Sequence, residues 1–568
     1  MLNREHHGII IVMKSGDSSN KVASYLQAHI SGDVLSGPKI RKAYAEDASI
    51  LTVTPNLIVY PRTTNDIRKV ARFAWQLAEK GHVLPITPRG SGTDTSGAAI
   101  GKGIILNTTA HMGKILELDT KQRLVRVQPG LNFKSLQETL HTHGLFVPAY
   151  PANYKYSTIG GAIANNASGE KSFKYGSMND WVEKLEVVLA NGEVIQTGKI
   201  NKKELERKKG LASLEGELYR AVDGIVADHE AAIYEYDDTR KSILTRDNVG
   251  YSISDVFTKD GSCDLTPLFV GSQGTLGIIT EAILKVETYT PQTSLLVASF
   301  DSMEAMADAV DIAVKLSPSS IEMIDQGLID FVKNERGMNI LQSVFESVDI
   351  PPKAVLFIEC DDDNQRKRTK KIKKLYKEIS KIAVDIRATD DLELQEAFWT
   401  ARASTSAVLQ YEKGHTAALP IIDDCIVPPE KLLDLLGVIT ELAAKHKLEL
   451  AVWGHAGDAN LHVMPLLDLT KLGDRQKVFK VMNEYFASVV ALGGSIAAEN
   501  NEGRLRVPFV AMQLGEELSD VMVSIKKAFD PYGMLNPGVK TGTTLKHLVD
   551  MLREDYSLVR HADYVPRI

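Results

Sequence analysis

Alternating apolar and polar segments indicate that the first half of the chain mixes short strands with helices. Four runs of apolar and β-branched residues have the length and composition of buried strands; they are 57–60, 103–106, 124–127 and 185–189. Residues 64–80 predict a helix beginning at Thr63 or Thr64, because their apolar side chains recur at helical spacing on one face. Asn191-Gly192 predicts a tight hairpin turn after the fourth strand.

The pattern changes after Pro291. Residues 295–300 predict a strand and 302–316 a helix, and a second strand and helix follow, which indicates a separate α+β unit. Turn-forming residues at 529–540 predict the end of a helix. Residues 1 to about 50 predict a helical lead-in. Residues 198–210 predict a charged surface excursion, and 268–270 predict a return to β structure. The chain is therefore predicted to be an α+β protein with more than one domain.

Bulk composition narrows the class of protein. The length of 568 residues predicts two or more domains, and 44% hydrophobic with 24% charged residues is ordinary for globular chains. A net charge of -7 disfavours nucleic acid as a partner. Cys263, Cys360 and Cys425 are too few and too far apart for a disulfide framework or an iron–sulfur cluster. Since no apolar run approaches the roughly 20 residues of a membrane span, we expect a cytoplasmic protein, or one peripheral to the inner membrane face.

One segment has an unusual charge pattern. Residues 366–377 contain eight basic residues and no acidic residue. Two interpretations stay open: a solvated helix face, or a patch that contacts anionic lipid, to which each basic residue would contribute about 1 kcal/mol.

Three glycine-rich segments indicate a cofactor site. They are 88–97, 159–169 and 271–280. Dense glycines allow the backbone to approach a ligand closely, and successive N–H groups in such turns form concavities that hold phosphate oxygens. The dinucleotide fingerprint Gly-x-Gly-x-x-Gly directly after a strand is absent, and so is a Walker-type Lys-Ser/Thr. Three such segments favour an extended cofactor that contains a pyrophosphate.

A second group of candidates lies in the later half. His455 and His462 flank a Gly-Asp-Ala-Asn turn, and a strand, turn and returning strand could direct both imidazoles at one point. With Glu499 they would form a two-His-one-carboxylate metal site with open positions. Taken alone, a purely structural role for the histidines stays open. Arg402 could bind a carboxylate in bidentate fashion, although a lone arginine is more often a surface or salt-bridge residue.

Together these segments resemble the FAD-binding fold of the vanillyl-alcohol-oxidase (PCMH) type, in the branch of D-lactate dehydrogenase, glycolate oxidase and D-2-hydroxyglutarate dehydrogenase. The resemblance runs from about Tyr44 to Lys540 and rests on five segments, 43–49, 89–97, 157–169, 271–280 and 536–538. It implies an α+β fold in which a two-part FAD-binding domain precedes an α+β cap domain. The implied boundaries are 1–288 for the FAD domain (core about 51–288), 289–528 for the cap, and 529–568 for a C-terminal segment that returns to the FAD domain.

The resemblance also implies which residues bind FAD. They are Arg89, Gly90, Ser91, Gly92, Thr93, Asp94, Pro151, Ser157, Thr158, Gly160, Gly161, Asn165, Ala167, Gly169, Gln273, Gly277, Ile278, Ile279 and Asn536. No histidine lies in 88–110, where covalently flavinylated relatives carry one, so non-covalent FAD is expected. Gln273 stands where relatives often have Glu, which predicts a mild change in a polar contact.

The reacting centre follows from the same resemblance. It implies that His455, His462 and Glu499 bind a divalent metal (Zn, Mn or Fe), and that Arg402 holds the substrate carboxylate, with Ser406 and His455 as further substrate contacts. Relatives follow the glutamate with a histidine that removes the hydroxyl proton, but this chain has Asn500, and an amide is not a general base. The resemblance gives Arg402, Asn500 and His462 as the candidate catalytic residues, and another group or the metal would have to take the hydroxyl proton.

The resulting functional hypothesis is an FAD-dependent dehydrogenase of a small-molecule D-2-hydroxyacid, with D-lactate favoured and D-2-hydroxyglutarate or glycolate as alternatives. Two other hypotheses stay open: a flavin oxidase of a non-acidic alcohol or sugar, and a flavin-binding protein whose catalysis is impaired by Asn500. Electrons would pass to an unidentified acceptor, namely a quinone, a cytochrome or an electron-transfer flavoprotein. A peripheral membrane contact through 366–377 and a homodimer are further expectations.

Overall fold

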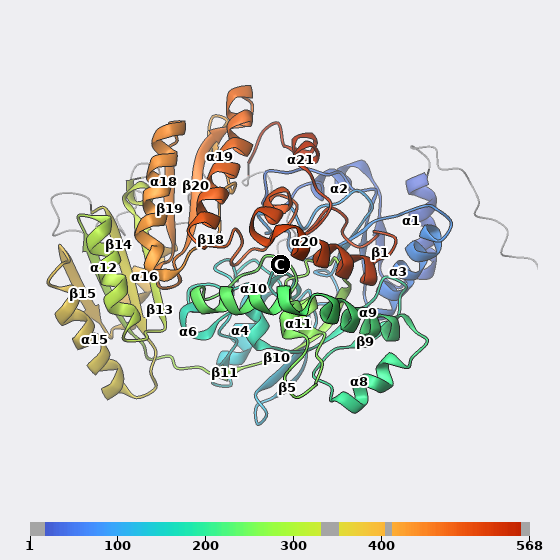
Figure 1. Cartoon of the computed structure of the whole chain (residues 1–568), viewed down its shortest axis with the longest axis horizontal. Coiled ribbons are helices and arrows are strands. Elements are labelled where there is room, and N and C mark those ends of the chain that lie inside the picture. Colours follow the sequence, from blue (N-terminus) through green and yellow to red (C-terminus); the bar gives the residue numbers. More distant parts are fainter. Residues whose placement is uncertain (1–17, 331–351, 404–411, 558–568) are drawn as a thin grey trace, which may run out of the picture.

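The computed structural model describes residues 18–330, 352–403 and 412–557, and these form three main β-sheets with helices packed around them (Figure 1). The first sheet has the order β1-β2-β4-β3. Its strands are β1 (Asp33–Leu35), β2 (Leu57–Tyr60), β3 (Ile86–Arg89) and β4 (Ile104–Asn107). β2 and β3 both run parallel to β4, and helix α3 (Thr64–Ala78) packs its apolar face, including Ile67 and Val70, into the core.

The second sheet is antiparallel, with the order β5-β6-β10-β8-β9. Its strands are β5 (Ile115–Asp119), β6 (Leu124–Val127), β8 (Val182–Val188), β9 (Val194–Gln196) and β10 (Ile278–Lys285). The predicted hairpin at Asn191-Gly192 joins β8 and β9, and Gly192 adopts a φ of 85°. Several helices cover this half: α4 (Phe133–His141), α5 (Ile159–Asn165), α6 (Ser172–Tyr175), α8 (Lys202–Lys209), α9 (Leu214–Asp228) and α10 (Glu230–Ile243).

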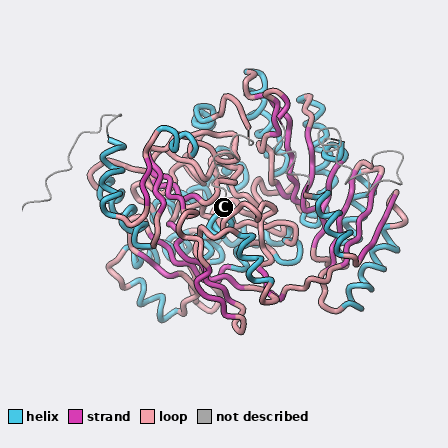
Figure 2. Tube along the Cα trace, turned by 180° about the vertical axis from the view of Figure 1, so that it is seen from behind, coloured by secondary structure: helices cyan, strands magenta, loops and turns pink. Residues whose placement is uncertain are grey.

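The third sheet forms the opposite end of the molecule (Figure 2). Its order is β15-β12-β14-β13-β19-β20-β17-β16, and β18 also pairs with β20. Its larger strands are β12 (Ser294–Phe300), β13 (Ser320–Asp325), β14 (Ala354–Cys360), β15 (Asp385–Thr389), β19 (Leu450–His455) and β20 (Asn460–Asp468), and the short ones are β16 (Glu412–Lys413), β17 (Thr416–Ala418) and β18 (Cys425–Ile426). Its helices are α12 (Met303–Val314), α15 (Gln365–Ile379), α16 (Leu392–Arg402), α18 (Leu432–His446) and α19 (Leu472–Ala491).

The chain returns to the first half before it ends. The backbone N–H groups of Arg504 and Leu505 donate to Ser96 O, and helix α20 (Val510–Phe529) packs on α9 and α10. Next, Ile86 N–H donates to Met534 O, which adds Leu535 beside β3. The return therefore begins upstream of residue 529.

Most predicted elements agree with the structure, and three differ. The predicted helical lead-in, of which residues 1–17 lie outside the described part of the chain, contains α1 (Ser18–His29) and α2 (Pro38–Ala43) but also strand β1 of the first sheet. Residues 268–270, predicted as β, overlap the short helix α11 (Thr266–Phe269). The second glycine-rich segment is partly helical, because Thr158 caps α5 by accepting a hydrogen bond from Gly161 N–H at 3.2 Å. Local composition favoured turns at this segment, whereas packing of Ile159, Ala162 and Ile163 in the core stabilises a helix.

Candidate functional site

The three glycine-rich segments meet around one cleft. The cleft contains about 990 Å³ of atom-free space, partly open to solvent, and lies between the first and second sheets. All but two of the predicted FAD-binding residues line it. The sequence interpretation did not include several further lining residues, namely Pro88, Ala98, Ala99, Thr108, Pro129, Asn153, Ala162, Ala164 and Gly274. These are mostly small or apolar residues without a distinctive chemical signal.

Backbone conformation explains why glycines line this cleft. Gly92 has a φ of +77°, a region that L side chains rarely adopt, and a Cβ there would overlap the Arg89 guanidinium. A Cβ at Gly90 would overlap the Thr158 side chain. The loops thus present bare backbone, as a phosphate or a flat ring system requires.

Buried polar atoms in the cleft also fit a polar ligand. Arg89 Nε, Ser91 Oγ and Ser157 Oγ have no hydrogen-bond partner among the described residues. Buried polar groups in native structures almost always have a partner. Three orphaned groups around one cleft are therefore consistent with the phosphates and ring heteroatoms of FAD.

Gly169 and Asn536 do not line the cleft. A Cβ at Gly169 would overlap Tyr150 O, so this glycine permits close packing of two loops. Asn536 is fully buried, and its Nδ2 donates to Ala98 O at 2.9 Å and Gln273 O at 2.7 Å. Both residues hold the cleft loops together from the side facing away from the cleft. The structure therefore does not support direct contact of either residue with a bound cofactor.

Gln273 connects the cleft walls. Its Nε2 donates to Asn165 Oδ1 at 3.0 Å, and its Oε1 accepts from Gly503 N–H at 2.9 Å. A carboxylate at this position could not donate to Asn165. The amide is therefore matched to its surroundings, and its contact with FAD remains a prediction.

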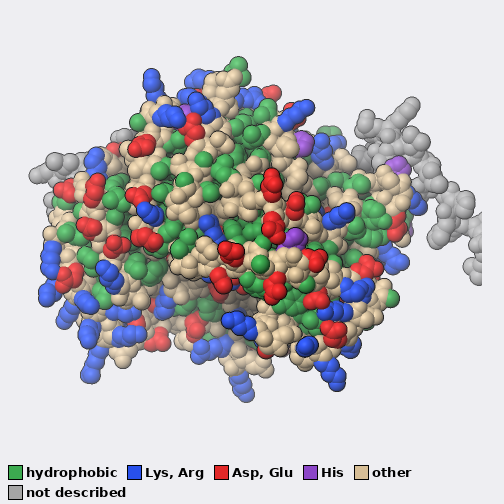
Figure 3. Space-filling model, in the orientation of Figure 1, with side chains coloured by type: hydrophobic (Ala, Val, Ile, Leu, Met, Phe, Trp, Pro, Cys, Tyr) green, Lys and Arg blue, Asp and Glu red, His purple; other side chains and the backbone are tan. Residues whose placement is uncertain are grey.

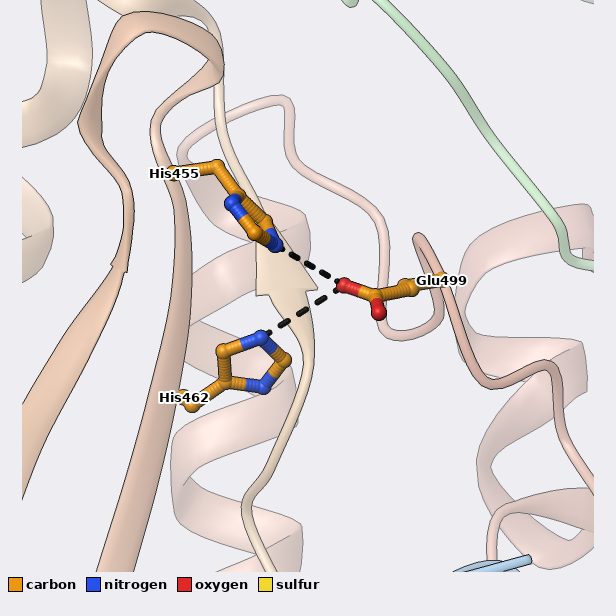
Figure 4. A group of neighbouring side chains, drawn as sticks. All are labelled: His455, His462 and Glu499. Carbon is orange, nitrogen blue, oxygen red and sulfur yellow. Dashed lines mark hydrogen bonds and ion pairs between the residues drawn. The ribbon is translucent and has the colours of Figure 1, made fainter. Parts of the chain in front are cut away.

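The second site is a buried cluster of His455, His462 and Glu499 (Figure 4). His455 ends β19 and His462 lies on β20, opposite Trp453 in the antiparallel register. Because alternate residues of a strand share a face, His455 lies on the same face as Trp453 and therefore beside His462. Glu499 Oε2 lies 3.0 Å from His455 Nε2 and 3.5 Å from His462 Nε2.

A second carboxylate holds each imidazole. His455 Nδ1 lies 2.7 Å from Glu322 Oε1 on β13, and His462 Nδ1 lies 2.8 Å from Asp423 Oδ1. Metal-bound histidines commonly donate their other ring N–H to a carboxylate, which orients the ring and leaves the opposite nitrogen for the metal. Both Nε2 atoms face Glu499 here, so the donor set fits a divalent cation.

The electrostatics of the cluster support the same conclusion. Burial lowers the pKa of His455, but the carboxylates of Glu322 and Glu499 outweigh this effect and raise the pKa to about 9. Burial likewise lowers the pKa of His462, and Asp423 with Glu499 raises it well above its ordinary value. Without a cation, protons on both imidazoles therefore offset the negative charge of the neighbouring carboxylates. A divalent cation could replace them, as metal binding generally releases protons from its ligands.

Asp424 fixes the backbone that carries Glu499. Its carboxylate accepts from the N–H groups of Glu499 at 2.9 Å and Asn500 at 2.7 Å, and from Asn460 Nδ2 at 3.3 Å. The sequence interpretation missed Glu322, Asp423 and Asp424. The adjacent Asp423-Asp424 pair within an apolar segment was the one available signal, since buried acids need partners.

Arg402 is not an open carboxylate clamp in this structure. It ends α16, is 2% exposed, and contacts Glu322 Oε2 through Nε at 3.1 Å and Nη2 at 2.7 Å. Glu322 thus bridges Arg402 and His455. The expected bidentate fork is occupied by a protein carboxylate, and the substrate role of Arg402 remains a prediction. Ser406 lies outside the described residues.

Asn500 joins the two sites. It lines the glycine-rich cleft and directly follows Glu499. Its backbone carbonyl oxygen accepts a hydrogen bond from Gln273 Nε2 at 3.4 Å. The cleft and the metal-type cluster are therefore neighbours through a single peptide unit.

The basic segment 366–377 lies on helix α15 at the edge of the molecule, where Figure 3 shows Lys and Arg side chains gathered at the lower left. Arg368 points inward and donates through Nε to Ser294 Oγ at 3.1 Å, while Lys367 and Lys371 pair with Asp362. Tyr376, on the same helix, is 42% exposed. No helix in the described part of the chain is long and apolar enough to cross a membrane. Lipid contact by α15 stays a prediction.

Two models of known protein families match this chain. Residues 55–198 match the FAD binding domain model, and residues 290–539 match the model for FAD linked oxidases, C-terminal domain. The chain is 31% identical over 489 residues to glycolate oxidase subunit GlcD of Bacillus subtilis (strain 168), covering 85% of this chain and 88% of that protein. The chain therefore belongs to the FAD-linked oxidase family, as a PCMH-type FAD-binding flavoprotein with an FAD-linked oxidase C-terminal domain.

Other relatives lie in the same branch. The chain is 30% identical over 523 residues to a D-2-hydroxyglutarate dehydrogenase of Haemophilus influenzae, covering 90% of this chain but about half (50%) of that protein. It is 25% identical over 515 residues to a D-lactate dehydrogenase of Anaerostipes hadrus, covering 89% of this chain and 94% of that protein. The chain is accordingly an FAD-linked oxidoreductase of the 2-hydroxyacid dehydrogenase branch.

Solved structures confirm the predicted fold class. 4-Ethylphenol oxidase from Gulosibacter chungangensis superimposes with a TM-score of 0.67 at 15% identity, covering 94% of this chain and 98% of that one. p-Cresol methylhydroxylase superimposes with a TM-score of 0.66, also at 15% identity and with the same coverage. The α+β arrangement of an FAD-binding domain followed by a C-terminal oxidase domain is therefore correct.

Proposed function

We propose that the protein oxidises a D-2-hydroxyacid, with D-lactate the favoured substrate, to the corresponding 2-oxoacid. The observation that supports this most directly is the buried His455, His462 and Glu499 cluster adjoining the glycine-rich cleft through Asn500. FAD in the cleft would supply a two-electron acceptor, and a divalent metal in the cluster would supply a Lewis acid for the hydroxyl group. The printed names of the relatives, which include glycolate oxidase and D-lactate dehydrogenase, support this substrate class.

The chain's own groups have defined roles in this proposal. Glu322 and Asp423 orient His455 and His462, and Asp424 holds the backbone of Glu499. Arg402 contributes positive charge beside Glu322 and binds the substrate carboxylate through guanidinium N–H groups other than the two that contact Glu322. Burial of all these groups excludes water, which strengthens their electrostatic effect on a bound hydroxyacid.

The substrate hydroxyl proton needs an acceptor, because Asn500 cannot take it. Glu502, a carboxylate near Asn500 in sequence, is occupied: it pairs with Lys540 at 2.5 Å and accepts from Gly250 N–H at 2.5 Å. Glu170 is the better candidate. It is partly buried beside the charges of Arg402 and His455, and has no hydrogen-bond or ion-pair partner among the residues that the structure describes. Burial raises the pKa of Glu170 above its ordinary value, and a carboxylate with a raised pKa is better matched to general-base work.

The deciding experiment is anaerobic flavin reduction with a substrate panel. D-Lactate, glycolate and D-2-hydroxyglutarate should bleach the flavin, while L-enantiomers and alcohols without a carboxylate should not. Arg402→Lys should weaken hydroxyacid binding, since an ammonium cannot reproduce the guanidinium fork, and Glu170→Gln should slow reduction at saturating substrate.

The occupied fork of Arg402 is the observation that favours a second candidate, the oxidation of a non-acidic alcohol or sugar. Bleaching by polyols but not by hydroxyacids would establish that alternative. Absence of bleaching by any compound would favour a flavin-binding protein without this chemistry.

A further inference from the structure

A short segment from the first half of the chain lies directly against the third sheet. It consists of α6 and the two residues before it, 170–175, and it follows the second glycine-rich segment. Figure 1 shows α6 beside β13, where the first half meets the third sheet. We call residues 170–175 the bridging segment, because they connect a wall of the cleft to the sheet that carries the metal-type cluster.

The bridging segment contacts the turn between the two histidine strands. Ser172 Oγ donates to Asp458 Oδ2 at 2.8 Å, in the 3₁₀ turn that joins β19 to β20. A Cβ at Gly457, in the same turn, would lie 2.9 Å from Phe173 Cδ2, so the Phe173 ring packs directly on this turn. The bridging segment is therefore held close to the cluster.

Ion pairs join the same segment to the end of β14. Lys171 Nζ lies 2.6 Å from Glu359 Oε1, and their side chains are only 17% and 7% exposed. Lys174 Nζ lies 2.5 Å from Asp361 Oδ1, and the Tyr175 hydroxyl donates to Asp361 Oδ2 at 2.7 Å. Burial lowers the pKa of Lys171, but Glu359 and Asp361 outweigh this effect and raise the pKa above its ordinary value. Lys171 is therefore cationic in its pair with Glu359.

Glu170 begins the bridging segment and is the proposed acceptor of the substrate hydroxyl proton. Burial raises its pKa, and the charges that act on it are those of Arg402, Glu322, His455 and Glu359. It has no hydrogen-bond or ion-pair partner among the residues that the structure describes. Its side chain is therefore placed by the backbone of the bridging segment, which the next residue, a lysine, ties to the third sheet.

Lys171 also controls a charge close to Glu170. Glu322 and Glu359 are diagonal neighbours on one face of the third sheet, because the β13–β14 register puts them two positions apart. Arg402 pairs with Glu322, and Lys171 pairs with Glu359. Loss of Lys171 would leave Glu359 as a buried carboxylate without a cation, and such a charge is costly and acts on neighbouring carboxylates.

We infer that Lys171 is a positioning residue for the reaction, and that its ion pair with Glu359 holds Glu170 in place beside the metal-type cluster. The inference rests on the proposed function, in which Glu170 takes the hydroxyl proton. Lys171 acts through Glu170 and does not contact the substrate. The remaining contacts of the bridging segment keep the two halves docked when Lys171 is replaced, so the expected change is local to Glu170.

The test is a double-mutant cycle on the holoenzyme, read as the limiting rate of anaerobic flavin reduction at saturating hydroxyacid. D-Lactate, glycolate and D-2-hydroxyglutarate are the probes. Lys171→Gln cannot reach Glu359 and should slow reduction by about 10- to 100-fold, since misplacing a reacting group by about 1 Å can cost about 100-fold. In the Glu170→Gln background the same substitution should change the rate by less than about 2-fold, because the group that it positions is gone. Lys171→Arg, which keeps charge and reach, should retain at least about half of the wild-type rate.

Lys208→Gln is the matched control. Lys208 lies 2.5 Å from Glu215 Oε1, and its side chain is 20% exposed, close to the 17% of Lys171. This pair joins α8 to α9, and Figure 1 shows α8 far from β19 and β20. Lys208→Gln should therefore reduce its flavin at the wild-type rate. FAD absorbance and divalent-metal content should stay constant in every variant, which distinguishes a misplaced base from a general loss of structure.

The outcomes separate this inference from the proposed function. An unchanged limiting rate in Lys171→Gln, with a wild type that is readily reduced, would overturn the inference alone. Independent, multiplying effects of Lys171→Gln and Glu170→Gln would also overturn it, because Lys171 would then not act through Glu170. A wild type that no hydroxyacid reduces would overturn the proposed function and the inference with it. If Lys171→Gln loses FAD, Glu359→Leu breaks the same ion pair from the third sheet, and the cycle with Glu170→Gln is read from that variant with the same expected result.

Discussion

The glycine-rich cleft and the His455–His462–Glu499 cluster are adjacent but are built in opposite ways. The cleft is formed by three loops whose backbone faces the ligand, and its glycines matter because they lack side chains. The cluster is formed by ionisable side chains of β19, β20 and the segment that carries Glu499, and each of its two imidazoles is held by a further carboxylate. The difference teaches that a backbone site depends on local conformation, whereas an ionic site depends on a network that only the folded chain assembles.

Removing a cluster residue should have the largest effect. His455→Ala should lower divalent-metal affinity by more than about 100-fold, because loss of a ligand exceeds the 10–100-fold effect of an outer-shell change. Inductively coupled plasma mass spectrometry after dialysis against metal buffers measures this. His446→Ala is the control, since His446 pairs with Glu484 outside the cluster. Full metal content and turnover in His455→Ala would remove the metal from the proposal.

Asn500→His tests the junction between the two regions. We expect flavin reduction by D-lactate to speed up by about 10²-fold, the lower end of the contribution of a positioned base, with a new dependence on pH near neutrality. Stopped-flow absorbance across pH 5 to 10 measures both. A fast wild type with a bell-shaped profile that the substitution leaves unchanged would show that the proposed base, Glu170, already takes the proton at full efficiency and that a histidine at position 500 adds nothing.

Asp423→Asn tests whether a carboxylate outside the cluster controls metal binding. The amide keeps the shape of Asp423 but weakens its hold on His462 Nδ1, so metal affinity should fall by about 10–100-fold while FAD content stays constant. Competition with a fluorescent chelator measures the affinity. Asp434→Asn, at a carboxylate on α18 that pairs with Lys431, should have no effect. A simultaneous loss of FAD would indicate that the two regions are not independent.

Gly92→Val tests the glycine-rich cleft, where bare backbone faces the ligand. The added side chain would overlap Arg89 and strain a φ of +77°, so FAD affinity should fall by about 10-fold or more. Flavin fluorescence quenching during titration of the apoprotein measures it. Gly81→Val is a matched control, because Gly81 has a φ of +81° with open space around it. Equal FAD affinity in both variants would mean that this loop is not the phosphate site.

The smallest expected effect concerns pH. Burial and then the Asp47 carboxylate raise the pKa of Asp94 in the cleft to about 6. Below this value Asp94 is neutral, and above it the carboxylate repels the FAD phosphates, so FAD affinity should decline about 3-fold as pH rises from 5.5 to 7.5. The same titration at both pH values measures this, and Asp94→Asn should abolish the dependence. A pH dependence that survives in Asp94→Asn must come from another group.

Much of the fold could be read from local pattern. The strand 57–60 and the helix capped at Thr63 were predictable because a short β-branched run and a 3.6-residue apolar period each have one dominant local solution. The segment 159–165 was not, because its glycines and small residues are compatible with turns, and burial of one face stabilises a helix there.

The amino-acid sequence by itself determined that the chain is α+β and that three glycine-rich segments were candidates for a cofactor site, because these depend on residue type and local pattern, and its resemblance to a known family made His455, His462 and Glu499 metal-ligand candidates. Only the tertiary structure decided that Arg402 pairs with Glu322, that Asp423 and Asp424 support the cluster, and that Lys171 pairs with Glu359 of the third sheet. The physical reason is that the pairing of buried charges depends on which distant segments pack together, and long-range packing has no local periodicity to reveal it.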